Sequence, residues 1–211
     1  MRRPGTARAV SPEPITRPKL LVVEGQDARH FLGALLGHLG LGGDIQITDA
    51  GGIDEWTVRL QGIRGATGFD QLQSLGLIRD AEAGSASAVQ SVCAVLRRAG
   101  LPVPAAPFQA VDGPPRVGVF ILPDCASAGM LETLCVQAVA ADAAMPCVDA
   151  FIGCLQDRLA DPPANLDKAR VRAFLASRLR SHLLLGQAAR AGYIPWDSPA
   201  FHPLKQFLRN L

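Results

Sequence analysis

Hydrophobic positions along this chain follow two alternating patterns. Short apolar runs, typical of β-strands, occur at residues 20–23, 45–48, 75–78 and 117–122. Between them, apolar residues recur every three or four positions, as on the buried face of a helix, over residues 27–39, 56–60, 85–98 and 131–139. The alternation of strands with helices predicts an α/β fold with a mainly parallel sheet flanked by helices. Residues 45–48 alternate apolar with polar, which places that strand nearer the sheet edge.

The two ends of the chain lack the strand pattern. Residues 1–18 carry basic residues and four prolines without an apolar segment, so we expect a flexible N-terminal arm. From residue 146 onward only helical spacing remains, and helices are expected at 147–159, 166–184 and 203–208. The predicted organisation is therefore an arm at 1–18, an α/β domain at 19–145 and an α-helical C-terminal extension at 146–211 packed on it.

Composition narrows the class of protein only modestly. The 211 residues have a formal net charge of +2, so binding to nucleic acid would require a local basic patch. The five cysteines show no metal-binding spacing, and buried free thiols in a cytoplasmic protein are expected. No segment has the roughly 20 consecutive apolar residues of a membrane span, so no membrane partner is expected.

Acidic residues follow the predicted strands where their carboxyl ends would meet. Glu24 comes directly after residues 20–23, Asp80 and Glu82 after residues 75–78, and Asp124 after residues 117–122. In a parallel sheet with right-handed crossovers these ends border one crevice. If the backbone stays extended, Asp80 and Glu82 point the same way. Clustered carboxylates without histidine or cysteine suit Mg²⁺ or Mn²⁺.

The same residues carry a resemblance to a known domain. Glu24-Gly25-x-Asp27 after one apolar strand and Asp80-x-Glu82 after another resemble a Toprim domain, a Rossmann-like fold. With Leu122-Pro123-Asp124 and Gly129-Met130-Leu131-Glu132, the pattern over about residues 19–140 resembles small stand-alone Toprim-like proteins allied to the OLD-family nucleases.

The resemblance implies specific roles. Glu24 is expected to be the general acid/base or a metal ligand, Asp80 and Glu82 to hold Mg²⁺, and Glu132 to help a second metal ion. Lys168 is the expected electrostatic stabiliser. The family usually has aspartate where this chain has Glu82, which is longer by one methylene.

Each candidate also has a purely structural explanation. Glu24 could simply end a strand, Asp80 and Glu82 could lie in a solvated loop, and Asp124 could begin a turn. Glu132 could be a first-turn acid favoured by the helix dipole, and Asp27 a helix N-cap. Two further features also have a structural explanation. The pair Gly51-Gly52 could form a phosphate-binding turn or a turn without a ligand. Four arginines of the C-terminal part are expected on the solvated surface: Arg170, Arg172, Arg178 and Arg180.

The sequence therefore predicts an Mg²⁺-dependent Toprim-type nuclease, or another phosphodiester-processing enzyme, acting on DNA or RNA. Because the chain has no Gly-x-x-x-x-Gly-Lys-Ser/Thr loop, any ATPase partner would be encoded separately. A homo-oligomer is left open. One alternative is a catalytically inactive Toprim-like binding or regulatory subunit of a larger assembly. Another is a Rossmann-like enzyme acting on a small phosphorylated substrate.

Overall fold

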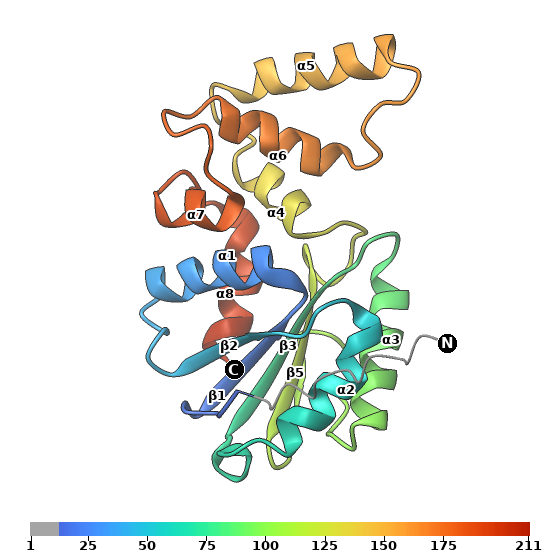
Figure 1. Ribbon diagram of the computed structural model, residues 1–211, viewed down its shortest axis with the longest axis vertical. Helices are drawn as coiled ribbons and strands as arrows, with labels where there is room; N and C mark the ends of the chain where they lie inside the picture. Colours follow the sequence, from blue (N-terminus) through green and yellow to red (C-terminus); the bar gives the residue numbers. More distant parts are fainter. Residues whose placement is uncertain (1–12) are drawn as a thin grey trace, which may run out of the picture.

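The computed structural model describes residues 13–211 and contains one five-stranded sheet in the order β2-β1-β3-β5-β4 (Figure 1). Four strands are parallel, and only the short β4 runs antiparallel to its neighbour β5. The strands are β1 (Lys19–Val23), β2 (Ile45–Asp49), β3 (Ser74–Asp80), β4 (Ala110–Val111) and β5 (Arg116–Leu122). The predicted α/β fold with a mainly parallel sheet is confirmed, and the strand at residues 45–48 does lie at the sheet edge.

Helices follow the strands as the spacing predicts. Those of the first part are α1 (Gly25–His38), α2 (Ile53–Arg64), α3 (Ser85–Arg98) and α4 (Leu131–Ala138). Those of the second part are α5 (Met145–Arg158), α6 (Leu166–Ala176), α7 (Leu185–Arg190) and α8 (His202–Arg209). Two short 3₁₀ segments complete the described elements, η1 (Phe69–Gln71) and η2 (Pro199–Phe201). None of the helices within residues 13–211 is long and apolar enough to cross a membrane.

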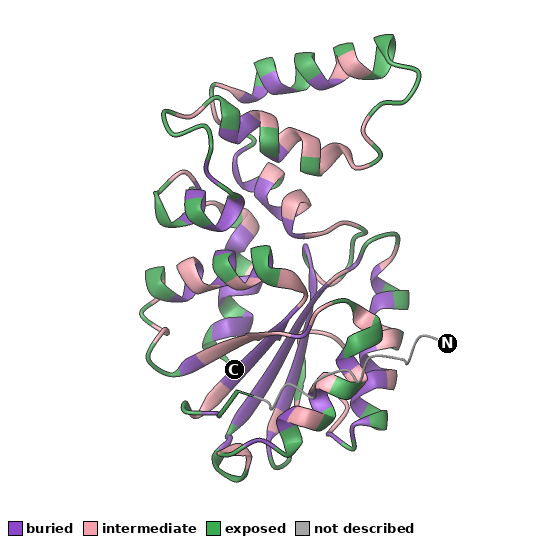
Figure 2. Cartoon of the chain, in the orientation of Figure 1, coloured by how far each residue is buried: buried purple, intermediate pink, exposed green. Residues whose placement is uncertain are grey.

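The sheet is buried on both faces, which explains its continuous apolar strands. Leu21 and Val23 of β1 belong to a core built with α1, α4 and the later helices. Leu20 and Val22 face the other way, into a second core built with α2 and α3. Figure 2 shows the central strands buried along most of their length.

The C-terminal helices continue the first of these cores. In Figure 1, α5 and α6 stand beyond the carboxyl ends of the strands, with α4 between them and the sheet. The chain then returns through α8, whose Phe207 lies 3.1 Å from where a Cβ of Gly118 would stand. One apolar cluster therefore runs from the strands through α4, α5, α6, α7 and α8.

The N-terminal arm was predicted to be flexible over residues 1–18. Residues 1–12 lie outside the described residues. Beyond them, Ile15 is buried and its N–H donates to the Thr67 carbonyl at 2.9 Å. The chain is therefore attached to the α/β domain at Ile15, before β1 begins.

Three local predictions need correction. The helix expected over 166–184 ends at Ala176, because the Ser177 hydroxyl donates to the Phe174 carbonyl at 2.7 Å and competes with further helical hydrogen bonds. As a result α7 forms separately, and it was not predicted. Asp27 is not the N-cap of α1, because the helix already begins at Gly25 and Asp27 lies in its first turn.

The expectation of buried thiols was correct for part of the set only. Cys93 and Cys135 are buried, whereas Cys147 and Cys154 are exposed. They lie seven residues apart on α5, and thus on the same side of the helix. The apolar residues that bury α5 include Met145, Val148 and Ile152, so its opposite side faces outward.

Candidate functional site at the carboxyl edge of the sheet

Glu24 stands where the sheet topology predicts a ligand-binding crevice. β1 pairs with β2 on one side and with β3 on the other. The connection after β1 leads to one side of it, and the connection after β2 crosses to the other side, so the strand order reverses at β1. Open α/β sheets bind ligands at such a switch point, outside the carboxyl ends of the strands. Glu24 follows β1 directly, and 23% of its side chain is exposed.

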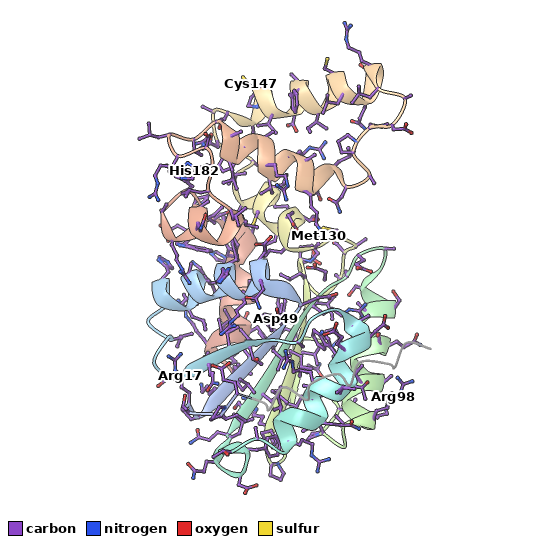
Figure 3. All side chains as sticks on the ribbon, in the orientation of Figure 1. Arg17, Asp49, Arg98, Met130, Cys147 and His182 are labelled. Atoms are coloured by element: carbon purple, nitrogen blue, oxygen red, sulfur yellow. The ribbon has the colours of Figure 1, made fainter. Side chains whose placement is uncertain are left out.

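A second carboxylate fixes the turn that presents Glu24. Gly25 has φ of +85°, a conformation that favours glycine. Asp49, the last residue of β2, accepts hydrogen bonds through Oδ1 from the N–H groups of Gly25 at 2.9 Å and Gly51 at 2.8 Å. Figure 3 labels Asp49 at this end of β2, beside the start of α1. Because the Gly51 N–H already donates to Asp49, it stabilises a turn and is not free to bind a phosphate.

Arg79 is the buried neighbour of Glu24. Its Nε lies 3.6 Å from Oε2 of Glu24, and Arg79 is only 9% exposed. These two atoms are both buried and make no hydrogen bond with the described part of the chain. Burial raises the pKa of Glu24 above its ordinary value, and the charges of Glu82 and Asp49 add to this, while the Arg79 guanidinium lowers it. Ionisation of the Glu24 carboxyl is therefore less favourable than in an exposed glutamate, in spite of the Arg79 charge.

Asp80 ends the neighbouring strand β3. Val23 pairs with Ile78, so Glu24 and Asp80 leave adjacent strands at the same edge of the sheet, and Arg79 is the next residue of β3 in register with Glu24. Oδ1 of Asp80 accepts a hydrogen bond from the Leu131 N–H at the start of α4, at 2.9 Å. Burial first, and then the charges of Glu132 and Glu24, raise the pKa of Asp80 to about 7 against the effect of that hydrogen bond.

Glu82 does not extend β3, which corrects the expectation that it points the same way as Asp80. The strand ends at Asp80, and Glu82 adopts φ of +51° in the left-handed region. Its N–H donates to the Gly129 carbonyl at 2.7 Å, and its carbonyl accepts from the Gly129 N–H at 2.9 Å. This bridge turns the backbone, yet the Glu82 charge still contributes to the raised pKa of Glu24.

Glu132 and Lys168 are brought to the same edge by α4 and α6. They line one cavity together with Asp27 of α1. The Lys168 charge lowers the pKa of Asp80, opposing the Glu132 charge. One hydrogen bond ties these helices together: the Thr133 hydroxyl donates to Asp167 at 2.7 Å, while it also accepts from the Met130 N–H at 3.1 Å at the start of α4.

Asp124, in contrast, is engaged in its own loop. It is exposed, and its carboxylate accepts from the N–H groups of Ala126 and Ser127 and from the Ser127 hydroxyl. Although burial raises the pKa of Asp124, these hydrogen bonds hold it below its ordinary value. The turn explanation therefore accounts for this residue, and a metal-binding role for it stays a prediction.

Sequence reasoning missed Asp49 and Arg79. Asp49 is an acid at the carboxyl end of a predicted strand, as Glu24 and Asp80 are, so the same rule could have found it. Arg79 was hidden because it lies within a strand, and nothing in the linear sequence gives the register that places it against Glu24.

The donor set at this edge is all oxygen, as Mg²⁺ prefers. Within residues 13–211, no three His, Cys, Asp or Glu side chains are gathered as a ready-made metal site. Mg²⁺ does not require one, because proteins commonly bind it through one or two carboxylates, with water and substrate phosphates completing the shell. The proximity of Asp80 to Glu24 and Glu132 fits that mode.

Comparisons with protein families and with solved structures identify proteins that are similar to this chain. No curated protein matches it. The C-terminal region of the OLD protein from Xanthomonas campestris pv. campestris, phased with mercury, is similar in fold, with a TM-score of 0.50 and 14% identity over 92% of this chain and 95% of that one. The iodine-phased structure of that region gives a TM-score of 0.49 with the same identity and coverage. Residues 18–211 match the profile described as "Protein of unknown function (DUF3226)". The chain belongs to the DUF3226 family.

Proposed function

We propose that the protein is a Toprim-type nuclease that uses Mg²⁺ or Mn²⁺ to cleave phosphodiester bonds in DNA or RNA. The observation that carries the proposal is the position of Glu24 and Asp80 at the ends of adjacent strands at the switch point, where burial and the charges of Glu132 and Glu24 raise the pKa of Asp80. A divalent cation relieves the repulsion between such charges. The similarity in fold to the OLD C-terminal region is consistent with a nuclease-related role.

In this proposal Asp80, with Glu24 and Glu132, would hold the metal ion, and Glu82 would be a further ligand from the rim. The bound ion would supply charge neutralisation on the phosphate and a more acidic water. Its presence would also lower the pKa of Asp80, since the cation favours the ionised carboxylate. The nucleic acid is then the partner that completes the site.

Glu24 is the residue best suited to move a proton. Its raised pKa brings it closer to the neutral range in which a general acid or base works efficiently. The Asp49 hydrogen bonds fix the turn beneath it, which keeps its position defined. Lys168, across the cavity from the carboxylates, would stabilise negative charge on the phosphate.

The test is cleavage of plasmid DNA, single-stranded DNA and RNA by the purified chain with Mn²⁺. Glu24→Gln should reduce the rate by about 10²–10⁴-fold, as expected for loss of general acid–base catalysis. Asp80→Asn should abolish the metal-dependent cleavage. Asp161→Asn, which removes an exposed carboxylate in the loop between α5 and α6, should cut like the parent. If Glu24→Gln and Asp80→Asn proteins cut as fast as the parent, the proposal is wrong.

A second candidate function is a catalytically inactive binding or regulatory subunit. The buried Arg79 favours it, because a fixed guanidinium 3.6 Å from Glu24 supplies positive charge that a metal ion would otherwise provide. On this alternative the parent protein would show neither cleavage nor Mn²⁺-dependent stabilisation. A protein whose unfolding midpoint rises with Mn²⁺, and whose rise is lost in Asp80→Asn, would exclude it. A separately encoded ATPase partner is compatible with either proposal.

A further inference from the structure

A cavity of about 240 Å³ adjoins the acidic edge and joins residues that are far apart in the sequence. Carboxylates reach it from the first turns of α1 and α4, as Asp27 and Glu132. Cationic and hydrogen-bonding groups reach it from α6 and from the segment between α6 and α7. They are Lys168, Arg172, Ser181 and His182. Figure 3 labels His182 in that segment.

One face of α6 forms much of this cavity. Lys168, Val171, Arg172 and Leu175 are spaced so that they lie together along one side of a helix. Val171 and Leu175 are buried and give the cavity an apolar floor, whereas Lys168 and Arg172 are exposed at its rim.

The cations that line the cavity differ from neighbouring arginines in forming no ion pair within residues 13–211, although the carboxylates of Asp27 and Glu132 line the same cavity. Arg170 pairs with Asp149 at 3.1 Å and with Asp167 at 3.3 Å. Arg178 likewise pairs with Asp142 at 2.7 Å.

Lys168 and Arg172 form no salt bridge within residues 13–211, although they belong to the same helix as Arg170. Acids thus neutralise the two paired arginines, while the cations at the cavity have no such partner. Guanidinium and ammonium groups in this state bind phosphate through charge-assisted hydrogen bonds.

We propose that this cavity is a phosphate-binding subsite, which holds the phosphate and sugar of the nucleotide next to the linkage at the acidic edge. Arg172 and Lys168 would contact the phosphate oxygens, with the Ser181 hydroxyl and the His182 ring as further hydrogen-bonding groups. The assignment of the phosphate to a nucleic-acid strand rests on the proposed function.

The size and position of the cavity support this occupant. Cavities for drug-sized ligands measure roughly 300–1,000 Å³, so about 240 Å³ suits a phosphate with its sugar better than a larger molecule. The Lys168 charge acts on the Asp80 carboxyl, so the subsite lies within electrostatic reach of the acidic edge. The apolar floor would pack against the sugar.

The experiment titrates the full chain with inorganic phosphate in the absence of divalent metal, followed by ³¹P NMR line width. Arg172→Gln should weaken binding by about 10–100-fold, as expected for loss of a charge-assisted hydrogen bond. Arg158→Gln removes an exposed arginine at the end of α5, outside the cavity, and should bind as the parent does. Equal phosphate binding by the parent and Arg172→Gln, or an equal loss in Arg158→Gln, would overturn the subsite.

The two proposals fail in distinguishable ways. If the acidic edge does not cleave nucleic acid, phosphate binding that depends on Arg172 still supports an anion site in the cavity. If cleavage depends on Glu24 and Asp80 but phosphate binding does not depend on Arg172, only the proposal of the subsite is wrong. Where cleavage is found, Arg172→Gln should raise KM about tenfold or more and leave kcat within about twofold, since it removes binding rather than chemistry.

Discussion

Replacing Asp80 with asparagine should make the protein more stable at alkaline pH, even though it removes a central residue of the candidate site. Asparagine keeps an oxygen that can accept the hydrogen bond from the Leu131 N–H. It cannot ionise, so it avoids the cost of placing a negative charge among Glu24 and Glu132 in a mostly buried position. The parent protein bears that cost whenever Asp80 is ionised in the folded state.

The magnitude follows from the pKa of Asp80, which rises from an ordinary value of 3.8 to about 7 on folding. At about 1.4 kcal/mol per pKa unit, ionisation of Asp80 costs the folded state about 4 kcal/mol at pH 8. At pH 5 the folded state keeps Asp80 protonated while the unfolded chain ionises it, and the cost is about 1.5 kcal/mol. Because the folded pKa is the higher one, stability falls as pH rises from about 4 to about 7. Partial exposure of Asp80 makes these values upper limits.

Urea denaturation followed by tryptophan fluorescence is a suitable assay, since Trp56 is fully buried. The advantage of Asp80→Asn over the parent should grow by about 2 kcal/mol between pH 5 and pH 8. Asp161→Asn should show no such growth. Adding Mn²⁺ at pH 8 should stabilise the parent and leave Asp80→Asn unchanged. A difference between parent and Asp80→Asn that is the same at every pH would refute the reasoning.

Three further outcomes are expected. Arg79→Met should destabilise the fold by about 2 kcal/mol, measured by urea denaturation; this is less than for a fully buried pair because Glu24 is partly exposed. The loss of stability should be larger at pH 8 than at pH 5. Gly129→Ala should lower stability by about 1–3 kcal/mol, measured by thermal unfolding, because a Cβ would meet the Thr133 hydroxyl at 2.7 Å in a backbone with φ of +136°. A thiol-reactive dye should label Cys147 and Cys154 rapidly in the native protein.

Each of these has a matched control. Gly153 lies in the interior of α5 with open space around it, so Gly153→Ala should stabilise the helix by about 0.5–1 kcal/mol. Rapid labelling of Cys135 itself would contradict its burial, which also raises the pKa of its thiol well above the ordinary range. For Arg79→Met, a loss independent of pH would indicate that packing, rather than the Glu24 charge, sets its effect.

The strands and the position of the acidic edge could be predicted because they depend on local signals. A parallel strand buried on both faces must be apolar throughout, so residues 20–23 and 75–78 stand out, and right-handed connections then place Glu24 and Asp80 at one edge.

What could not be predicted depends on contacts between distant residues. The position of Arg79 against Glu24 depends on the register of β1 with β3, and the turn at Glu82 depends on its bridge to Gly129, 47 positions along the chain. The prediction of one helix over 166–184 was wrong for a different, local reason. Its apolar spacing continues past Ala176, but the side-chain hydrogen bond of Ser177 ends the helix.

The Asp49 carboxylate has a consequence for how the site would fail under stress. Among the strands of residues 13–211, β2 borders only β1, and such edge strands open by local fluctuation at lower free energy than central ones. Because Asp49 holds the amide of Gly25, detachment of β2 would release the turn beneath Glu24 while the rest of the sheet stayed intact. Mild warming or low denaturant would then disturb Glu24, the proposed proton-transferring group, well before the protein melts. Inactivation that precedes any loss of tryptophan burial would be its signature.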